Sequence, residues 1–416
     1  MNPILVMVAW AGAGMIGAIV LPRVRRRRWA VVVPAAGLLA ALMLGAGTAP
    51  ALSAGALELG QLGRAGQGLA VAMAASMTLT VLLSPTLDGP ETLTIGIAGA
   101  ASALALSTGS VALRAVALMV AVAAVGLRWI AAAPGRLTLA AGRVGGGAAA
   151  ALTAAAVFLP VTGLSGGPRP ALAAILLACG VAGLLGQLPV GGWAVAGFVA
   201  VRGIDVAVWQ LLIVPVVLVT AGGVATLLPD PAAGLYNQIL LISGLVTAVW
   251  NGLLALRTPA AARYGRVVIA DLGLAVAAIG SGHVTAALSG VLLLILTHLV
   301  VAPLLLHPPE PSRLPPQRAA WALLSGLPPA PSFWARFTLL EALVQAGSGL
   351  MLAAVPAMAA VFVAAVLAAL PSSGVAAPAR GERLRLPEVA GWVLVAAALA
   401  LGLVPAAVTT FVFGTS

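Results

Sequence analysis

Long apolar segments recur along the whole chain and restrict it more than any other feature of the sequence. An α-helix needs about 20 consecutive, mostly apolar residues to cross the hydrocarbon core of a bilayer, and the segment 285–306 is one of many that meet this requirement. Only 7% of the 416 residues are charged and 62% are hydrophobic, whereas about 25% of the residues of a typical soluble domain are charged. So few charges cannot cover a water-exposed surface, and the sequence therefore predicts an all-α, polytopic membrane protein.

The apolar segments predict about fourteen transmembrane helices in a single membrane domain that covers residues 1–416. No segment between them is long enough for a nucleotide-binding, flavin or iron–sulfur domain, so we expect neither a cofactor nor a catalytic centre in this chain. The expected helices fall near residues 3–22, 30–46, 67–84, 92–108, 111–131, 146–163, 171–188, 206–228, 235–256, 266–281, 285–306, 318–349, 351–370 and 388–412.

The basic residues predict the orientation of the chain. All 21 of them are arginine, and the formal net charge is +11. Because the basic residues of membrane proteins gather on cytoplasmic loops, this charge predicts a lipid bilayer rather than a nucleic acid as the partner. If the chain begins outside, most arginines lie in inside loops, and only Arg64, Arg114 and Arg169 lie in outside loops. The sequence thus predicts a multi-pass protein of the bacterial inner membrane with both termini in the periplasm.

The chain has one cysteine, Cys179, within an apolar segment. A single cysteine excludes a disulfide within the chain and a cysteine-ligated metal cluster. The three histidines are too far apart in the sequence to form a metal-ligand pattern, so no metal site is expected. We expect Cys179 to be a small buried hydrophobic residue.

Two of the expected helices are interrupted by glycine and proline. The seventh is broken around Gln187, Pro189 and Trp193, and the twelfth contains a longer break with Pro328, Pro329, Phe333 and Trp334. Lipid cannot satisfy the backbone groups that such breaks release, so breaks persist only against other protein or a water-filled cavity. Broken helices in corresponding positions of two halves indicate an ion path. The spacing of five helices predicts two inverted five-helix repeats, at about 92–230 and 235–370.

Four ionisable side chains in the expected helices are candidates for an ion pathway: Asp271, His298, Arg336 and Glu341. Charges within a membrane helix are costly and are functional candidates by default, although structural ion pairs are also common. Arg336 and Glu341 are five residues apart, which is about 140° around a helix, so each is expected to seek a partner on another helix. For each of the four residues, the sequence leaves both a structural and a functional role open. We expect a fifth group, Asp205, at the membrane interface.

Several segments follow the sequence patterns of one family. Residues 326–337 (GLPPAPSFWARF) match G-[IL]-P-P-x-x-G-F-[WF]-[GS]-K-[FY], and residues 183–193 match G-K-S-A-Q-x-P-[LF]-x-x-W. Weaker matches lie at 269–273, at 297–306 and at 400–405. With these segments the chain resembles the antiporter-like, proton-translocating membrane subunits of respiratory complex I, closest to subunit N of NADH-quinone oxidoreductase. The family also includes Mrp-type cation/proton antiporters and subunits of membrane-bound hydrogenases.

The resemblance implies a membrane-arm subunit of a complex-I-like or hydrogenase-like respiratory complex, with other membrane-arm subunits as partners. Such a subunit takes part in proton or cation translocation coupled to quinone-linked electron transfer, while the redox chemistry occurs elsewhere in the complex. The chain itself would then be a non-catalytic subunit of an NADH-quinone oxidoreductase-like enzyme.

The chain also departs from this family at the residues that are thought to carry protons. Leu184, Ala302 and Arg336 stand at three lysine positions, and the fifth expected helix lacks the family's glutamate. Desolvation lowers the pKa of a buried lysine so that it can release a proton, whereas arginine stays charged in proteins. The lysine relay of the family is therefore absent.

Three interpretations follow. The chain is a degenerate subunit that supports the membrane arm structurally, or it translocates ions with Asp271, His298, Glu341 and Arg336. Alternatively, it is a stand-alone secondary transporter or cation/proton antiporter.

Overall fold

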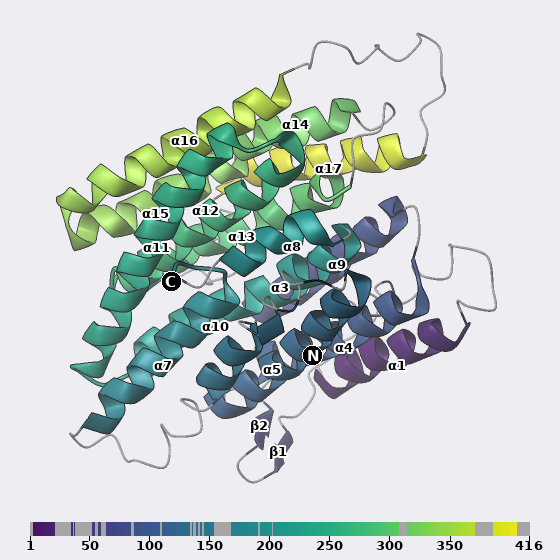
Figure 1. Ribbon diagram of the computed structural model, residues 1–416, viewed down its shortest axis with the longest axis horizontal. Helices are drawn as coiled ribbons and strands as arrows, with labels where there is room; N and C mark the ends of the chain where they lie inside the picture. Colours follow the sequence, from purple (N-terminus) through teal and green to yellow (C-terminus); the bar gives the residue numbers. More distant parts are fainter. Residues whose placement is uncertain are drawn as a thin grey trace.

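The protein is a bundle of helices that run roughly side by side (Figure 1). The computed structural model describes residues 3–20, 64–84, 87–108, 110–133, 168–189, 192–201, 203–307, 314–370 and 386–405, with short pieces within 35–59 and 135–153. The expected helix at 30–46 and the arginine cluster at 23–28 lie mostly or wholly outside the described residues. The expected helix at 146–163 is described only as far as residue 153.

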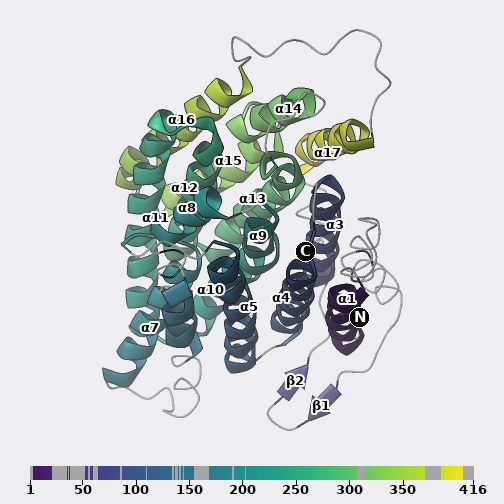
Figure 2. The same cartoon turned by 45° about the vertical axis from the view of Figure 1, so that its right-hand side comes forward.

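The first half of the chain contributes the helices on one flank of the bundle and two three-residue strands at its end (Figures 1 and 2). The strands form a small antiparallel hairpin in which Leu52 pairs with Leu59. The elements are α1 (Pro3–Val20), β1 (Leu52–Ala54), β2 (Leu57–Leu59), α3 (Arg64–Leu83), α4 (Gly89–Ser107), α5 (Val111–Ala132), α7 (Pro168–Leu184), α8 (Gly192–Ala200), α9 (Gly203–Ala207), the π-helical turn η2 (Val208–Ile213) and α10 (Val214–Leu227).

The second half forms the other flank. Here α11 packs along α12 and α16, and α13 packs against α15. The elements are α11 (Ala232–Arg257), α12 (Ala260–Gly280), α13 (Val284–Leu305), α14 (Leu314–Ser325), α15 (Pro331–Ala346), the 3₁₀ turn η4 (Ser348–Leu350), α16 (Met351–Ala369) and α17 (Leu386–Leu403).

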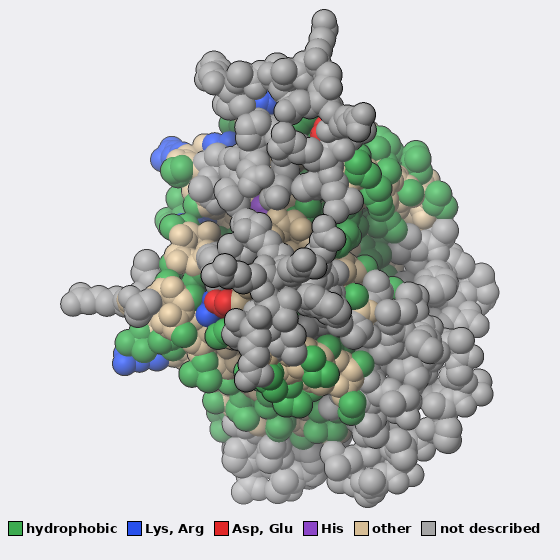
Figure 3. Space-filling view, turned by 90° about the vertical axis from the view of Figure 1, so that its right-hand side faces the viewer, with side chains coloured by type: hydrophobic (Ala, Val, Ile, Leu, Met, Phe, Trp, Pro, Cys, Tyr) green, Lys and Arg blue, Asp and Glu red, His purple; other side chains and the backbone are tan. Residues whose placement is uncertain are grey.

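Most described helices lie where the apolar segments of the sequence predicted them, with two differences: α8 has no counterpart among the expected helices, and the expected helix at 318–349 is divided into α14 and α15. Within the described residues, five helical segments are long and apolar enough to cross a membrane: Ala112–Ala132, Gly203–Leu227, Ala232–Arg257, Val284–Leu305 and Ser348–Ala369. The surface is also that expected of a membrane protein, because hydrophobic side chains dominate the described part of the face in Figure 3 and few charged side chains lie there. The total of fourteen spans stays a prediction.

Both predicted helix breaks are present. Helix α7 ends at Leu184, and Gly186 takes a positive φ of 68° before α8 begins at Gly192. Helix α14 ends at Ser325, and Gly326 takes a φ of 87° before α15 begins at Pro331. Positive φ is strained for residues with a Cβ atom, which is why glycine stands at both turns. Each break lies in the fourth of five helices in its predicted repeat, and the repeat relation itself stays a prediction.

Side chains satisfy the backbone groups that the breaks release. The indole Nε1 atoms of Trp193 and Trp209 donate to the carbonyl oxygens of Gly183 and Leu184, at 3.0 and 3.1 Å. At the second break, Ser332 Oγ donates to the carbonyl of Leu323. Specific hydrogen bonds therefore satisfy backbone groups beside both breaks, as the absence of water in a bilayer requires.

Small residues let the helices of the second half approach closely. A Cβ atom at Gly273 on α12 would lie 2.7 Å from the backbone nitrogen of Ala248 on α11. A Cβ atom at Gly290 on α13 would lie 2.6 Å from Thr338 Oγ1 on α15. Helices in membranes pack through such small residues, since lipid gives no hydrophobic drive for association. These contacts fix α12, α13 and α15 against their neighbours.

Cys179 differs from the expectation. Its side chain is exposed on α7 rather than buried. Ile175 and Leu172, about one and two turns earlier, are exposed on the same helix, so the thiol belongs to an outward-facing apolar stripe. A residue in an apolar run is buried in protein only if its helix face points inward, and the sequence alone did not give that orientation.

Candidate functional site

Three of the four predicted ionisable residues meet in the interior of the second half. Asp271 lies in the middle of α12, His298 in the last third of α13 and Arg336 in the second turn of α15. Their exposed fractions are 0%, 6% and 3%. The structure pairs Asp271 with an arginine on another helix.

The carboxylate of Asp271 is held from two sides. Arg336 donates from Nε to Oδ1 at 3.0 Å and from Nη2 to Oδ2 at 2.9 Å, which is a two-pronged pair. His298 Nε2 lies 3.1 Å from the same Oδ2. Arg336 and His298 therefore share one carboxylate oxygen, so a change of charge on the imidazole acts directly on the arginine pair.

Arg336 also completes the second helix break. Its Nη1 donates to the carbonyl oxygen of Ser325 at 3.0 Å. Ser325 is the last residue of α14, and the carbonyl end of a helix carries a partial negative charge that a cation stabilises. One guanidinium thus binds a carboxylate and a helix end together, which the rigid fork of arginine suits better than the single nitrogen of lysine.

The hydrogen bonds determine the tautomer of His298. A carboxylate paired with an arginine is ionised and can only accept hydrogen bonds, so His298 Nε2 must carry a proton and donate it to Asp271. The neutral imidazole then has its lone pair on Nδ1. Nδ1 is buried and has no hydrogen-bond partner among the described residues. A proton can therefore be gained or lost at Nδ1 without breaking the bond to Asp271.

A polar pair that the sequence analysis missed lies beside the imidazole. The Tyr264 ring is 6.4 Å from the His298 ring between centroids. Gln210 Nε2 donates to the Tyr264 hydroxyl at 2.6 Å. Gln210 belongs to the π-helical turn η2, and such turns are frequent at functional sites. A π turn has no clear signal in an apolar sequence.

A groove of about 300 Å³ reaches the other side of Arg336. It runs between α15 and α16 and is lined mainly by apolar side chains, including Phe333, Phe337 and Phe362. Phe337 and Phe362 are partly exposed on the outside of the bundle. Of the three residues of the cluster, Arg336 lines this groove together with the aromatic side chains.

Glu341 does not join this cluster. It lies on α15, as Arg336 does, but its side chain is exposed while Arg336 is buried. The angle of about 140° between the two positions places them on different faces, as expected. The structure thus separates the predicted set of four into a buried group of three and one peripheral carboxylate.

The predicted break residues surround the two turns. Gln187 is fully buried, and its Nε2 donates to the carbonyl of Leu185 at 3.0 Å. Trp334 donates from Nε1 to the carbonyl of Gly402 at 3.0 Å, which ties α15 to the end of α17. Pro189, Pro328 and Pro329 lie in the turns themselves, outside the helices.

A second buried ionic cluster lies in the first half. Arg128 near the end of α5 contacts three carboxylates: Asp205 at 2.8 Å, Asp88 at 3.1 Å and Glu91 at 3.2 Å. Asp88 and Glu91 also cap the start of α4, each side chain accepting from the other's backbone nitrogen at 2.7 Å. The sequence D-x-x-E before an apolar run is a recognisable signal for such a cap, and the sequence analysis passed over it.

Asp205, which was expected at the membrane interface, is buried in protein, and its depth in the membrane stays a prediction. Its exposed fraction is 3%, and its carboxylate binds Arg128. The fifth expected helix indeed carries no glutamate, but it carries the arginine around which the carboxylates of α4 and α9 gather. A carboxylate near the start of a helix can be buried in an ion pair or exposed to solvent, and the sequence did not distinguish these two states for Asp205.

Two of the three positions that hold lysine in the family that the chain resembles are occupied here by buried apolar side chains. Leu184 at the end of α7 and Ala302 on α13 both have an exposed fraction of 0%. No charge could be added at either position without a new partner. Of the three positions, only the one with Arg336 keeps a charge.

The sequence matches no family model and no curated protein. Solved structures match its fold over nearly the whole chain. A chain of the Mrp complex from Dietzia sp. DQ12-45-1b matches with a TM-score of 0.84 at 17% identity, and covers 100% of this chain. This chain spans about half, 52%, of the length of that one.

Two further matches cover both partners almost completely. A chain of respiratory complex I from Thermus thermophilus has a TM-score of 0.74 at 22% identity, with 98% of each chain covered. A chain of the membrane-bound sulfane sulfur reductase, an archaeal respiratory membrane complex, has a TM-score of 0.79 at 15% identity, with 99% and 96% covered. The chain is thus a multi-pass membrane protein with the fold of subunits of these membrane complexes.

Proposed function

We propose that this chain is a membrane-arm subunit of a multisubunit respiratory or antiporter-type complex, and that it moves protons through the buried cluster of Asp271, His298 and Arg336. The observation that carries the proposal is the pair of contacts on Asp271 Oδ2, from a fixed cation and from a histidine. The fold shared with chains of three membrane complexes supports the assignment to such an assembly.

His298 is the residue of the proposed site that takes up and releases the proton. Arginine stays charged in proteins, and Asp271 is paired with Arg336, whereas a neutral imidazole can accept a proton at the nitrogen that carries the lone pair. A proton that adds to Nδ1 makes an imidazolium, and the bond from Nε2 to Asp271 then becomes charge-assisted and stronger. Because Oδ2 is shared, the attraction between Asp271 and Arg336 weakens at the same moment. Release of the proton reverses both changes.

The other proposed features follow the family resemblance. The subunit would be of the subunit N type, with redox chemistry in neighbouring subunits, and would lie in a bacterial plasma membrane with both termini in the periplasm. The arginine distribution supports this orientation, since the opposite one would place most arginines outside.

A structural role is the second candidate, and a specific observation favours it. Leu184 and Ala302 fill lysine positions of the family with buried apolar side chains. A chain without these lysines can still hold its neighbours in place, and the buried ion pair then serves only to join α12, α13 and α15.

One substitution distinguishes the two functions. His298→Gln keeps an amide that can donate to Asp271 but removes the group that accepts a proton. The complex that contains the chain is purified, reconstituted into liposomes, and assayed for proton movement with a pH-sensitive dye. A proton-carrying role predicts intact assembly with strongly reduced proton movement.

The exposed Glu341 offers a matched control. Glu341→Gln should leave proton movement unchanged, because this carboxylate lies outside the buried cluster. If His298→Gln assembles and moves protons as the unmodified complex does, the proton-carrying role is wrong and the structural role holds.

A further inference from the structure

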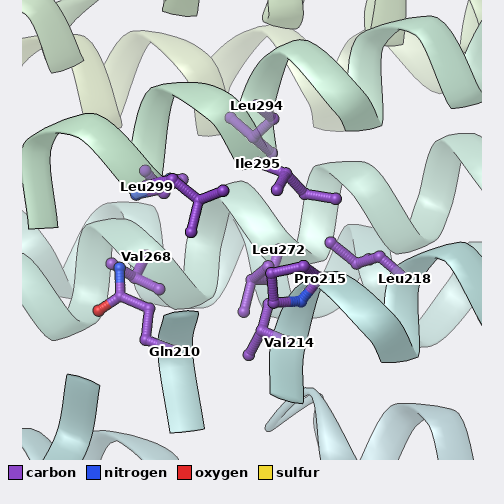
Figure 4. A pocket seen from close by; sticks show the side chains of 10 residues that line it. Gln210, Val214, Pro215, Leu218, Val268, Leu272, Leu294, Ile295 and Leu299 are labelled. Atoms are coloured by element: carbon purple, nitrogen blue, oxygen red, sulfur yellow. The ribbon is translucent and has the colours of Figure 1, made fainter. Parts of the chain in front are cut away.

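Two hollows lie near the buried cluster, and neither is suited to a charged ligand. The cavity between η2, α10, α12 and α13 has a volume of about 10 Å³ and a mostly aliphatic wall, and Figure 4 shows the Gln210 amide turned away from the aliphatic side chains. The groove beside Arg336 is larger, but this guanidinium already binds Asp271 and the carbonyl oxygen of Ser325. Arginines without an acidic partner among the described residues lie elsewhere, at the start of α12.

An arginine group, formed by Arg257, Arg263 and Arg266, lies where α11 turns into α12. Arg257 is the last residue of α11, and the other two lie in the first two turns of α12. Residues three apart on a helix are neighbours on one face, so Arg263 and Arg266 lie side by side. Arg266 Nη1 donates to Asn251 Oδ1 on α11 at 2.7 Å. The face of α12 that carries the two arginines therefore adjoins α11.

This face is where α12 reaches the outside of the bundle. Among the described side chains of α12, those of Ala262, Arg263 and Arg266 are partly buried, whereas all the others as far as Gly280 are buried. Arg257 at the end of α11 is exposed. A ligand that approaches from outside can therefore reach all three arginines.

The positive charge of the arginine group is not balanced within the described part of the chain. The sequence has no aspartate or glutamate between Asp230 and Asp271, and none of the three arginines forms an ion pair with a described residue. Like charges on neighbouring positions of a helix repel each other. The start of α12, whose first turn carries no acidic residue, adds the partial positive charge of a helix N-terminus.

Two buried donors of the group also lack an acceptor. The Nε atoms of Arg263 and Arg266 are buried and have no hydrogen-bond partner among the described residues. Buried polar atoms are nearly always satisfied by protein or by another bound group. The charge and the free donors therefore both indicate an anion with several acceptor oxygens.

An exposed apolar stripe on α11 leads to the arginine group. It consists of Ile242, Val246, Trp250 and Leu253, whose exposed fractions lie between 49% and 63%. With Arg257 they follow one another at spacings of three or four residues, so all five lie on one face of the helix. Figure 2 shows α11 on the outer flank of the bundle. The stripe rises about 17 Å along the helix, which is close to the roughly 15 Å of hydrocarbon in one leaflet.

We propose that the arginine group and the stripe together bind one anionic phospholipid. Its phosphate accepts hydrogen bonds from the three guanidinium groups, whose planar forks suit phosphate oxygens. One acyl chain lies along the stripe, from Leu253 toward Ile242. A free inorganic phosphate would use the arginines alone, and the stripe that continues from them favours the lipid.

The predicted orientation agrees with this ligand. It places the turn between α11 and α12 on the cytoplasmic side, where anionic lipids give the membrane a negative surface. Basic pockets between membrane helices on that side bind anionic head groups. The lipid site does not rest on the proton-carrying function, because none of its residues belongs to the cluster of Asp271, His298 and Arg336.

The test compares two phospholipids that carry the same photoactivatable acyl chain. One has the anionic phosphatidylglycerol head group, and the other has the zwitterionic phosphatidylcholine head group. Each is added in trace amount to phosphatidylcholine liposomes that contain the intact complex, and peptide mass spectrometry locates the cross-links. Phosphatidylglycerol should label α11 around Trp250 and Leu253 roughly tenfold more strongly than phosphatidylcholine. Both lipids should equally label the exposed Phe362 and Leu367 on α16, a helix without charged residues.

Substitutions assign the preference to the arginine group. Arg257→Gln should reduce it roughly fivefold, the effect of one basic residue beside an anionic lipid. The triple variant with Arg257→Gln, Arg263→Gln and Arg266→Gln should remove it, while unchanged labelling of α16 shows that the variant is folded. Arg143→Gln, which removes an exposed positive charge from the first half, is the matched control and should leave the preference unchanged.

Three results would overturn the lipid site. The first is equal labelling of α11 by both lipids, or a preference that survives in the triple variant. The second is loss of the preference when inorganic phosphate is added at the concentration of the probe, because the arginines would then bind a free anion. The third is labelling of α11 in the isolated full chain but not in the complex, because a neighbouring subunit would then cover this face.

Discussion

At the residue scale, the centre of the molecule is one carboxylate with two partners. Asp271 is fully buried and binds Arg336 through both oxygens. Burying two charges is offset only when their geometry is good, and removal of one partner leaves an uncompensated charge in a low-dielectric interior. The cluster therefore has a structural role whether or not it moves protons.

Asp271→Asn should destabilise the chain by about 3–5 kcal/mol, since Arg336 would keep its charge in the interior without a counterion. The measurement is thermal or denaturant unfolding of the purified complex in detergent. Glu341→Gln, which removes an exposed carboxylate, should stay within about 0.5 kcal/mol. An Asp271→Asn protein as stable as the unmodified one would mean that the pair does not form in the membrane.

The stability of Arg336→Lys in the same unfolding measurement should lie between that of the unmodified protein and that of Arg336→Gln. Lysine keeps the positive charge beside Asp271, but a single ammonium cannot reproduce both prongs to the carboxylate and the bond to Ser325. Equal stability of Arg336→Lys and the unmodified protein would contradict the role of the guanidinium in closing the break.

The sequence identified these side chains but not their contact. Asp271, His298 and Arg336 stood out because charge in an apolar segment is costly. Their meeting depends on how α12, α13 and α15 pack, which no local pattern contains. Glu341 was grouped with them because it is also a charged residue in an apolar segment, but its side chain lies apart from the other three. Gln210 and Tyr264 were missed because an amide and a phenol in apolar segments are ordinary.

At the element scale, the breaks and the close helix contacts position the site. The breaks were predictable, because prolines clustered with glycine release backbone groups that a continuous helix would pair, and each break lies where the sequence predicted it. The contacts between helices were not predictable, because 49 glycines are spread over the chain and the sequence does not distinguish those that face a neighbouring helix at close range, such as Gly273 and Gly290, from those that face open space, such as Gly234.

Gly290→Ala should destabilise the protein by roughly 1–3 kcal/mol, the usual effect of overpacking. Its Cβ atom would lie 2.6 Å from Thr338 Oγ1 and 2.8 Å from Leu339 Cγ, so α13 must move away from α15. Gly234→Ala on α11 is the matched control, since its Cβ atom would meet nothing within 4 Å. It should be neutral or slightly stabilising, because alanine favours a helix over glycine.

The second ionic cluster gives a test for the first half. Arg128→Gln would remove the ion pairs that this guanidinium makes with the buried carboxylates of Glu91 and Asp205, so we expect a loss of several kcal/mol in the free energy of unfolding. Arg257→Gln, at the exposed end of α11, serves as the control and should have little effect. A neutral Arg128→Gln would show that this cluster is hydrated in the membrane.

At the scale of the whole molecule, the proposed function predicts that the chain has other membrane subunits as partners. When the tagged chain is purified in mild detergent, mass spectrometry should find iron–sulfur, quinone-site and further antiporter-like subunits with it. Recovery of the chain alone or as a simple homo-oligomer would contradict the membrane-arm assignment and favour a stand-alone transporter.

The exposure of Cys179 gives this chain a ready-made chemical handle. It is the one thiol in 416 residues, and it faces outward from α7 beside Leu172 and Ile175. A lipid-soluble maleimide should therefore label the unmodified protein at a single position, without any engineered cysteine. Labelling of the isolated chain that disappears in the assembled complex would map this stripe to a contact with a neighbouring subunit. Labelling that persists would map it to the annular lipid.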